Sequence, residues 1–456
     1  MSSSTTQVSA RTAAGTAWVL GLCLIVAVLE GVDLQSTGVA APRMAREFGL
    51  SVSQMGLAFS AGMLGLLPGA MIGGRLADRI GRKRVLLLSM VAFGVFSIFT
   101  AHVWSFATLL VARVLTGVGL GGAMPNLIAL SAEAVAPRLR NTAVSIMYCG
   151  MPLGGALAAL IGVLSAGDTE WRHIFYAGGV GPLVVAPLIL ACLPESAAYE
   201  AASSRAQSTQ SGPPPTWRVL FGDGRAAVTA QIWISFFCTL IVLYFLLNWL
   251  PSLIVSRGLS RSQAGLTQIF FNVGSVIGVL GIGMLMDRVR PGRVVAAVYA
   301  GIAISLFMLA GAGNLFWISV SVLLAGMGVV GAQSMLYALS AASYATVMRG
   351  TGVGAAVAVG RVGSIVGPLA AGQLLAGGAS ATTVIGASVP VTVVAALAAL
   401  LAVSEVEHEH GRARARAARQ QLVVGGALLV GQVEIAMVRL AGQHARDAGA
   451  AYALLA

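Results

Sequence analysis

Long apolar runs separated by short polar segments dominate the chain. There are twelve of them, at about residues 18–41, 54–74, 84–102, 105–127, 143–165, 173–193, 228–250, 265–286, 294–312, 315–339, 352–377 and 381–403. A membrane-spanning helix needs about 20 mostly apolar residues, and these runs have that length. The first run carries Glu30 and Asp33 and is too long for the core of a signal peptide, so we expect it to be retained. The pattern predicts an all-α membrane protein with twelve transmembrane helices.

Composition agrees with this prediction. Of 456 residues, 57% are hydrophobic and 10% are charged, whereas an average soluble domain has about 25% charged residues. These values exclude a soluble enzyme, a secreted disulfide scaffold and a disordered chain. The net charge of +12 resembles that of a nucleic-acid-binding protein, but the basic residues lie at the ends of apolar runs. We therefore predict a lipid bilayer as the partner and no nucleic acid. The four cysteines form no CxxC pair, so no metal site is expected.

The basic residues also predict orientation. With the N-terminus inside, fifteen Arg and Lys residues fall in inside segments before the tail and five fall outside: Arg43, Arg46, Arg172, Arg257 and Arg261. This bias predicts that both termini are cytoplasmic. The longest inside loop contains a Gln/Ser run and three consecutive prolines, which is typical of a linker. The expected organisation is a cytoplasmic N-terminus (1–17), a six-helix bundle (18–193), a cytoplasmic linker (194–227), a second six-helix bundle (228–403) and a cytoplasmic tail (404–456).

The two bundles are related by an internal repeat with a single offset of 209 residues. The segment from Gly49 to Gly56 matches that from Gly258 to Gly265, and Pro42 matches Pro251. The matches continue in Gly65, Gly69, Gly74, Asp78 and Arg79 against Gly274, Gly278, Gly283, Asp287 and Arg288. Two parallel six-helix repeats are a known transporter plan, with the substrate site between the halves. The glycines spaced by four predict smooth helix faces that approach closely.

Four ionisable residues lie inside the predicted helices and break the repeat. The second half has Thr239 and Val242 where the first has Glu30 and Asp33, and Arg113 and Arg361 are equally unmatched. Charges at membrane depth are costly and mark function. A buried carboxylate is disfavoured in its charged form, so Asp33 is the candidate proton carrier, with Glu30 sharing the proton and Arg113 as the tuning cation. The alternative for Asp33 and Arg113 is a structural ion pair. Arg361 is a fixed positive charge suited to an anionic substrate.

The loop after the second helix resembles the signature of the major facilitator superfamily. It reads from Gly74 to Arg84, and a weaker copy follows from Gly283 to Arg293. The resemblance implies two pseudo-symmetric six-helix bundles and a role for this loop in conformational switching. Glu133, at the inside end of its helix near Arg138 and Arg140, is interpreted as a gate contact. The full gating set is Gly74, Asp78, Arg79, Gly81, Arg82, Glu133, Arg140, Asp287, Arg288 and Arg349.

Two further segments resemble the aromatic acid/proton symporters of that superfamily, namely Glu30–Pro42 and Gly360–Pro368. The resemblance implies a secondary transporter and not an enzyme: proton-coupled uptake of an aromatic carboxylate such as 3-(3-hydroxyphenyl)propionate by alternating access. It further implies a bacterial inner-membrane protein without a cofactor, driven by the proton gradient and acting as a monomer. It assigns the essential acid to Asp33 and the helix-4 and helix-11 arginines to Arg113 and Arg361.

Aromatic and amide side chains near the middle of the predicted helices are candidates for holding the ring and its hydroxyl. With Arg361, the predicted substrate contacts are Tyr148, Phe270, Phe271, Asn272, Gln333 and Tyr337. For each of these residues taken alone, packing or a place in the aromatic belt at the membrane interface is the favoured interpretation. Two alternative functions stay open: a benzoate- or hydroxybenzoate-type acid symporter, and a drug/proton antiporter. The antiporter pattern at the fifth helix is only partly present, because the sequence there is Gly150-Met-Pro152-Leu-Gly154-Gly155.

Overall fold

A computed structural model describes residues 13–136, 139–165, 170–195, 216–222, 225–344, 349–408 and 437. These residues form helices and contain no strand. The helices are α1 (Ala13–Glu47), α2 (Val52–Ile80), α3 (Arg82–Ala101), α4 (Phe106–Glu133), α5 (Arg140–Tyr148), α6 (Gly150–Leu164), α7 (Arg172–Cys192), α9 (Thr216–Phe221), α10 (Ala226–Ser256), α11 (Arg261–Arg288), α12 (Pro291–Gly311), α13 (Leu315–Ser343) and α14 (Arg349–Ala376). A last helix occupies Ala381–His408.

Twelve helical segments of the described chain are long and apolar enough to cross a membrane. Each of the twelve predicted runs overlaps one of them, so the helix prediction is confirmed. Several helices extend a turn or more beyond the apolar run, as α1 does on reaching Glu47. The fifth span, Thr142–Leu164, is interrupted at Cys149, which separates α5 from α6. Pro152 explains the interruption, because it has no N–H to donate to the carbonyl of Tyr148.

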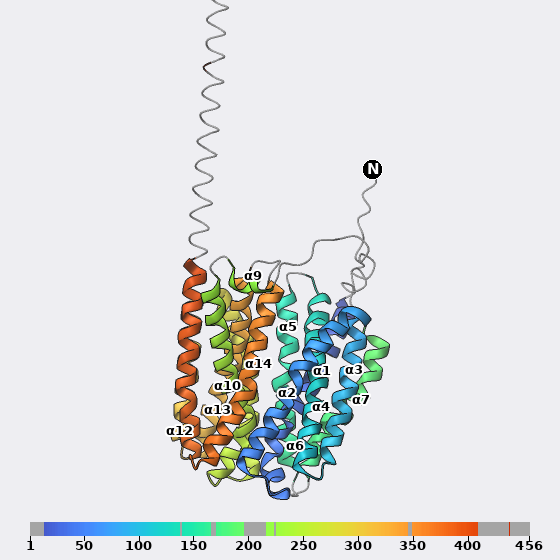
Figure 1. Cartoon of the computed structure of the whole chain (residues 1–456), viewed down its shortest axis with the longest axis vertical. Coiled ribbons are helices and arrows are strands. Elements are labelled where there is room, and N and C mark those ends of the chain that lie inside the picture. Colours follow the sequence, from blue (N-terminus) through green and yellow to red (C-terminus); the bar gives the residue numbers. More distant parts are fainter. Residues whose placement is uncertain are drawn as a thin grey trace, which may run out of the picture. The chain divides into compact units, whose positions relative to one another are not determined.

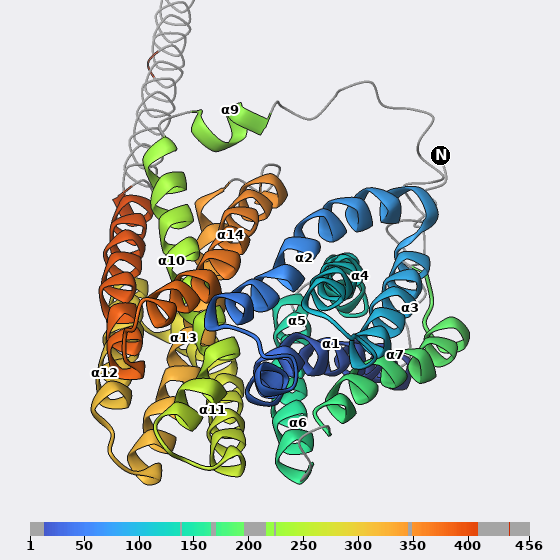
Figure 2. The same cartoon turned by 60° about the horizontal axis from the view of Figure 1, so that its bottom comes forward.

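The helices gather in two groups that meet along a seam. Figure 1 shows α1 to α7 on one side and α10 to α14 on the other. Across the seam, α1 contacts α10, α2 contacts α14, and α6 contacts α11 (Figure 2). The chain divides into two compact units at Val403, and the helices up to Ala402 belong to the first unit.

The internal repeat is visible in the local structure at the same offset. Ser51 and Gln54 form a capping box at the start of α2, and Ser260 and Gln263 form the same box at the start of α11. Each box follows a glycine with positive φ, Gly49 at 60° and Gly258 at 87°. Left-handed backbone of this kind favours glycine, since it has no Cβ to clash. The turn before α2 and the turn before α11 are therefore the same structure built twice.

The spaced glycines bring helix backbones together, and their partners also repeat at 209 residues. A Cβ on Gly65 would collide with the carbonyl of Val114 in α4, and one on Gly274 would collide with the carbonyl of Leu323 in α13. Gly69 meets Val118 and Gly278 meets Met327 in the same way. These contacts join helices of the same half. The predicted close approach of helices is confirmed. The helices that approach belong to the same half, α2 with α4 and α11 with α13.

Other glycines lie on the seam between the halves. A Cβ on Gly38 of α1 would lie 2.7 Å from the carbonyl oxygen of Leu247 in α10. One on Gly56 of α2 would lie 3.1 Å from that of Pro368 in α14. Both glycines lie toward the end of the bundle at which α1 ends and α2 begins, which we call the α1–α2 end. At this end the two halves are in backbone contact.

The glycine contacts make a prediction about stability. Gly65→Ala and Gly274→Ala should each destabilise the protein by about 1–3 kcal/mol, since the added methyl group overpacks a backbone contact. Gly74→Ala is the matched control, because a Cβ there meets open space. Thermal unfolding of the purified protein measures the effect. Equal melting temperatures for Gly65→Ala and Gly74→Ala would contradict the packing argument.

Candidate transport site

The first buried charge pair joins α1 to α4. The carboxylate of Asp33 lies 3.2 Å from the guanidinium of Arg113, and both side chains are almost completely excluded from solvent. The guanidinium also lies 5.8 Å from the centre of the Phe175 ring. Gly62 of α2 leaves room for it, since a Cβ there would lie 3.4 Å from Nη2 of Arg113. The pair is neutral as a whole, which is how two charges are tolerated among apolar helices.

Glu30 lies one helical turn before Asp33 but faces different surroundings. Its side chain is 2% exposed, and its Oε1 atom has no hydrogen-bond partner among the described residues. It lines a small hollow that Arg361 also lines. The complete lining is Glu30, Leu34, Leu66, Leu120, Met124, Met151 and Arg361. The hollow is thus a mostly apolar chamber with one acid from the first half and one base from the second.

Arg361 of α14 is surrounded by aromatic side chains. Its Nη1 donates a hydrogen bond of 2.7 Å to the hydroxyl of Tyr244 in α10. Tyr148 and Tyr337 are close enough to interact with it electrostatically. Their own hydroxyls are 3.4 Å apart and connect the two halves. Phe236 packs edge-on against Tyr337 with ring centres 5.4 Å apart. The cationic group is therefore held by the hydroxyl of Tyr244, with two further tyrosines near it.

Only some of the other predicted substrate contacts lie near Arg361. Tyr148 and Tyr337 join Arg361 as described, whereas Phe271 is completely buried in the contact of α11 with α13. Phe270 and Gln333 are half-buried. The sequence did not single out Tyr244 or Phe236. They lie within a dense run of mostly aromatic and aliphatic residues in α10, where the sequence pattern does not distinguish a site residue from packing.

Asn272 belongs to a cluster of amide side chains that crosses the seam. Its Nδ2 donates to Oε1 of Gln35 over 2.9 Å, and Gln35 donates back from Nε2 to Oδ1 over 2.9 Å. Gln268 donates to the same Gln35 oxygen over 2.8 Å. Gly155 of α6 makes room, because a Cβ there would overlap the Gln35 amide. Gln35, Gln268 and Asn272, which we call the amide cluster, hold α1 against α11 by uncharged hydrogen bonds.

The predicted gating set lies at the opposite end of the helices. Arg82 pairs with Glu133, and Glu195 accepts the backbone N–H of Lys83 over 3.0 Å. Gly81 lies against Glu195 with φ of 99°. These bonds tie the α2–α3 turn to the ends of α4 and α7. Arg79, Arg140 and Arg288 are exposed, and Gly74 borders open space. The side chains of Asp78, Asp287 and Arg349, and all of Arg138, lie outside the described residues.

Metal ligands do not gather anywhere in the described part of the chain, where no three His, Cys, Asp or Glu side chains come together. The four cysteines are free thiols, three of them buried. The described site residues offer ion pairing and hydrogen bonding.

Comparison with known proteins identifies the class. The family model of the Major Facilitator Superfamily matches residues 23–368 and 257–443. The chain belongs to this superfamily and is a membrane transporter. The fold agrees with a solved structure of the xylose transporter XylE from E. coli, at a TM-score of 0.69 and 16% identity over 84% of this chain and 97% of that one. A bacterial homolog of the lysosomal transporter Spinster gives a TM-score of 0.66 at 19% identity over 86% and 98%.

Sequence relatives give a narrower grouping. The chain is 47% identical to the 3-(3-hydroxy-phenyl)propionate transporter of Escherichia coli (strain K12), over 84% of this chain and 93% of that protein. It is 33% identical to the 4-hydroxybenzoate transporter PcaK of Pseudomonas putida, over 78% and 85%. The gallate transporter of the same organism is 34% identical over the same shares. The resemblance to aromatic acid transporters is confirmed, as is the prediction that the protein is not an enzyme.

The buried pair predicts a pattern of stability changes. Asp33→Leu and Arg113→Met should each cost about 3–5 kcal/mol, because each leaves one buried charge without its partner. The double variant should recover most of this loss, since it leaves no unpaired charge. Apparent melting temperatures of the four proteins test the pattern. Additive losses in the double variant would show that the two residues act independently.

Proposed function

We propose that the protein is a proton-coupled importer of an aromatic carboxylate such as 3-(3-hydroxyphenyl)propionate, working by alternating access. The observation that carries the proposal is the chamber between the halves that holds Arg361 opposite Glu30. A guanidinium binds a carboxylate through two parallel hydrogen bonds, which suits an acid substrate. The named activities of the relatives, which transport hydroxylated aromatic acids, support the same class of substrate.

The aromatic side chains around Arg361 supply the second part of recognition. Tyr148, Tyr244 and Tyr337 combine ring faces with hydroxyl groups, so they can pack against a substrate ring and bond its polar substituents. Arg361 disfavours a cationic substrate, which counts against drug/proton antiport. The glycines of the partial antiporter pattern also have another explanation, because Gly150, Gly154 and Gly155 all pack against α1. A benzoate- or hydroxybenzoate-type acid fits the same chemistry and stays the alternative.

Proton coupling follows from charge balance in the chamber. When a substrate carboxylate joins Arg361, two negative groups share one buried cation if Glu30 is ionised. Taking up one proton restores neutrality and avoids the cost of an uncompensated charge. Asp33 is the second carboxylate that can take the proton, and its protonation would release Arg113 from the ion pair. We assign coupling to Asp33 and Glu30, with Arg113 as the cation that sets the state of Asp33.

Alternating access requires the seam to open and close. At the α1–α2 end the halves are joined by the amide cluster and by the hydrogen bond of 2.9 Å from Ser60 to the carbonyl of Ile365. The positive-inside bias predicts that this end faces outward. We therefore propose that both termini are cytoplasmic, that the membrane is the bacterial inner membrane, and that the monomer transports without a cofactor.

The coupling proposal predicts variants that still exchange substrate across the membrane but no longer accumulate it against a gradient. Asp33→Asn and Glu30→Gln imitate protonated side chains. Each should lower proton-driven accumulation in vesicles at least tenfold while exchange of labelled for unlabelled acid continues. Uptake of 3-(3-hydroxyphenyl)propionate with and without an imposed pH gradient measures both activities. If Asp33→Asn accumulates the acid as the unaltered protein does, Asp33 is not a coupling residue.

Substrate affinity provides the second test. Arg361→Gln should weaken binding of the acid by about 10- to 100-fold, the value of a charge-assisted hydrogen bond of roughly 1.5–3 kcal/mol. Tyr244→Phe should weaken it less, because it removes only the support of the guanidinium. Arg46→Gln is the control, since Arg46 is exposed at the α1–α2 end. Calorimetric titration gives the affinities, and an affinity of Arg361→Gln within twofold of the unaltered protein would remove Arg361 from the site.

A further inference from the structure

The short helix α9 carries two large aromatic side chains on its exposed side. Trp217 is 66% exposed, and Phe221, four residues further along, is 46% exposed. Residues four apart lie on the same face of a helix, so the two side chains form one patch, which we call the aromatic face of α9. Leu220, by contrast, turns into the protein and is only 6% exposed. The helix is therefore apolar both toward the protein and away from it.

Hydrogen bonds hold α9 against the second half. The hydroxyl of Thr229 in α10 donates to the carbonyl oxygen of Leu220 over 2.7 Å. The same hydroxyl lies 2.9 Å from that of Tyr344, which follows α13 and is 3% exposed. A Cβ on Gly352 of α14 would collide with the Tyr344 ring, so that ring is closely packed. These contacts fix α9 to α10 and, through Tyr344, to the junction of α13 and α14.

The aromatic face continues into the flank of a spanning helix. Four residues separate Phe221 from Ala226, where the span of α10 begins. The Phe221 ring packs edge-on against that of Trp233 in α10, with ring centres 5.8 Å apart. The neighbouring residue in α10, Ile234, is 45% exposed. Exposed apolar side chains on a spanning helix are those that lipid covers, so the aromatic face adjoins a lipid-facing surface.

The other exposed tryptophans also lie near the ends of the helices. Trp104 and Trp317 lie at the α1–α2 end, just before α4 and in the first turn of α13, and are 70% and 51% exposed. Trp18 lies near the start of α1, at the end of the bundle where α9 is found, and is 53% exposed. Tryptophan is enriched at both interfaces between membrane and water. Trp217 and Trp18 thus lie where the second of two aromatic belts is expected.

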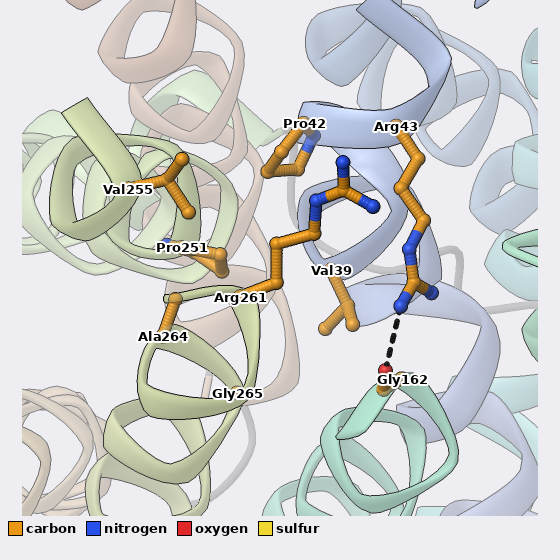
Figure 3. A pocket seen from close by; sticks show the side chains of 9 residues that line it. All are labelled: Val39, Pro42, Arg43, Gly162, Pro251, Val255, Arg261, Ala264 and Gly265. Atoms are coloured by element: carbon orange, nitrogen blue, oxygen red, sulfur yellow. Dashed lines mark hydrogen bonds between the residues drawn. The ribbon is translucent and has the colours of Figure 1, made fainter. Parts of the chain in front are cut away.

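The contacts of α9 with the rest of the protein lie within its own half. It contacts α10 and α14, and Figure 1 shows it lying across the end of the bundle at which α10 begins. The halves are in backbone contact at the opposite end. Figure 3 shows Arg261 of α11 reaching toward Pro42 of α1 there. The closure of the seam at that end therefore leaves the aromatic face uncovered.

We propose that α9 is an interfacial helix whose aromatic face binds the lipid bilayer, with Trp217 and Phe221 inserted between the headgroups and the first part of the acyl chains. Apolar faces of interfacial helices enter the bilayer to this depth. Residues 216–221, expected from the sequence to belong to a cytoplasmic linker, then lie in the membrane surface. Because α9 is bonded to α10 and to the α13–α14 junction, its insertion fixes the depth of these helix ends in the bilayer.

Fluorescence quenching in the full-length protein tests the contact. The protein is placed in nanodiscs of phosphatidylcholine and phosphatidylglycerol, and the Trp217 signal is the difference between the unaltered protein and Trp217→Phe. Phosphatidylcholine brominated near the headgroup end of its acyl chains should quench this signal at least twofold, and more than lipid brominated near their far ends. Acrylamide in the water should quench it several-fold less than it quenches free tryptophan. Trp171→Phe is the control, because Trp171 is completely buried and its signal should respond weakly to both quenchers.

Two results would overturn the proposal. Strong quenching of Trp217 by acrylamide with none by brominated lipid would place the face in water. Quenching by neither would show that protein covers it, either another segment of this chain or a second copy.

The attachment of α9 has its own test. Thr229→Val removes the hydroxyl that bonds Leu220, so lipid quenching of Trp217 should fall at least twofold, whereas Thr229→Ser should retain it. Equal quenching in Thr229→Val and the unaltered protein would overturn the proposed role of this bond in placing α9.

Discussion

A charge among apolar helices is tolerated only when another charge or several hydrogen bonds compensate for it, and this constraint organises the centre of the molecule. Asp33 and Arg113 meet it within one half, at 3.2 Å. Glu30 and Arg361 are divided between the halves and share a chamber. Under the proposed coupling, protonation of Asp33 would break the first pair, and the charge state of the second would depend on what else enters the chamber. The proposed coupling of substrate to proton would act through this electrostatic balance.

The duplicated scaffold meets a different constraint, the close approach of helix backbones. Gly65 against Val114 and Gly274 against Leu323 are one contact built twice, with both contacting residues shifted by the same offset. Such contacts are independent of charge and ligand, so each half can move as a body while its interior stays packed. Charged side chains are then added at a few positions that have no charged counterpart in the other half. Fold and function thus occupy largely separate sets of residues in this chain.

The sequence predicted the helices well because long apolar runs leave few alternatives. The offset of 209 located, without any coordinates, the charged residues that have no charged counterpart in the other half. The sequence also predicted Arg113 as the partner of Asp33, because a buried charge needs a nearby charge of opposite sign. It could not locate Tyr244, because an aromatic residue in an apolar helix has the same pattern whether it packs or binds. Nor could it separate Glu30 from Asp33. Residues three apart lie close along a helix, and only the neighbouring helices decide that one faces Arg113 and the other the chamber.

The amide cluster has a consequence for the speed of the cycle. Gln35, Gln268 and Asn272 exchange hydrogen bonds across the seam without any net charge. Water offers amides bonds of nearly equal free energy, so each bond lost on opening is replaced at a net cost of about 1 kcal/mol. An ion pair in the same place would leave two poorly solvated charges at the moment of separation. Neutral hydrogen bonds of this kind would keep the barrier low in both directions, which suits the opening and closing that the proposed alternating access requires.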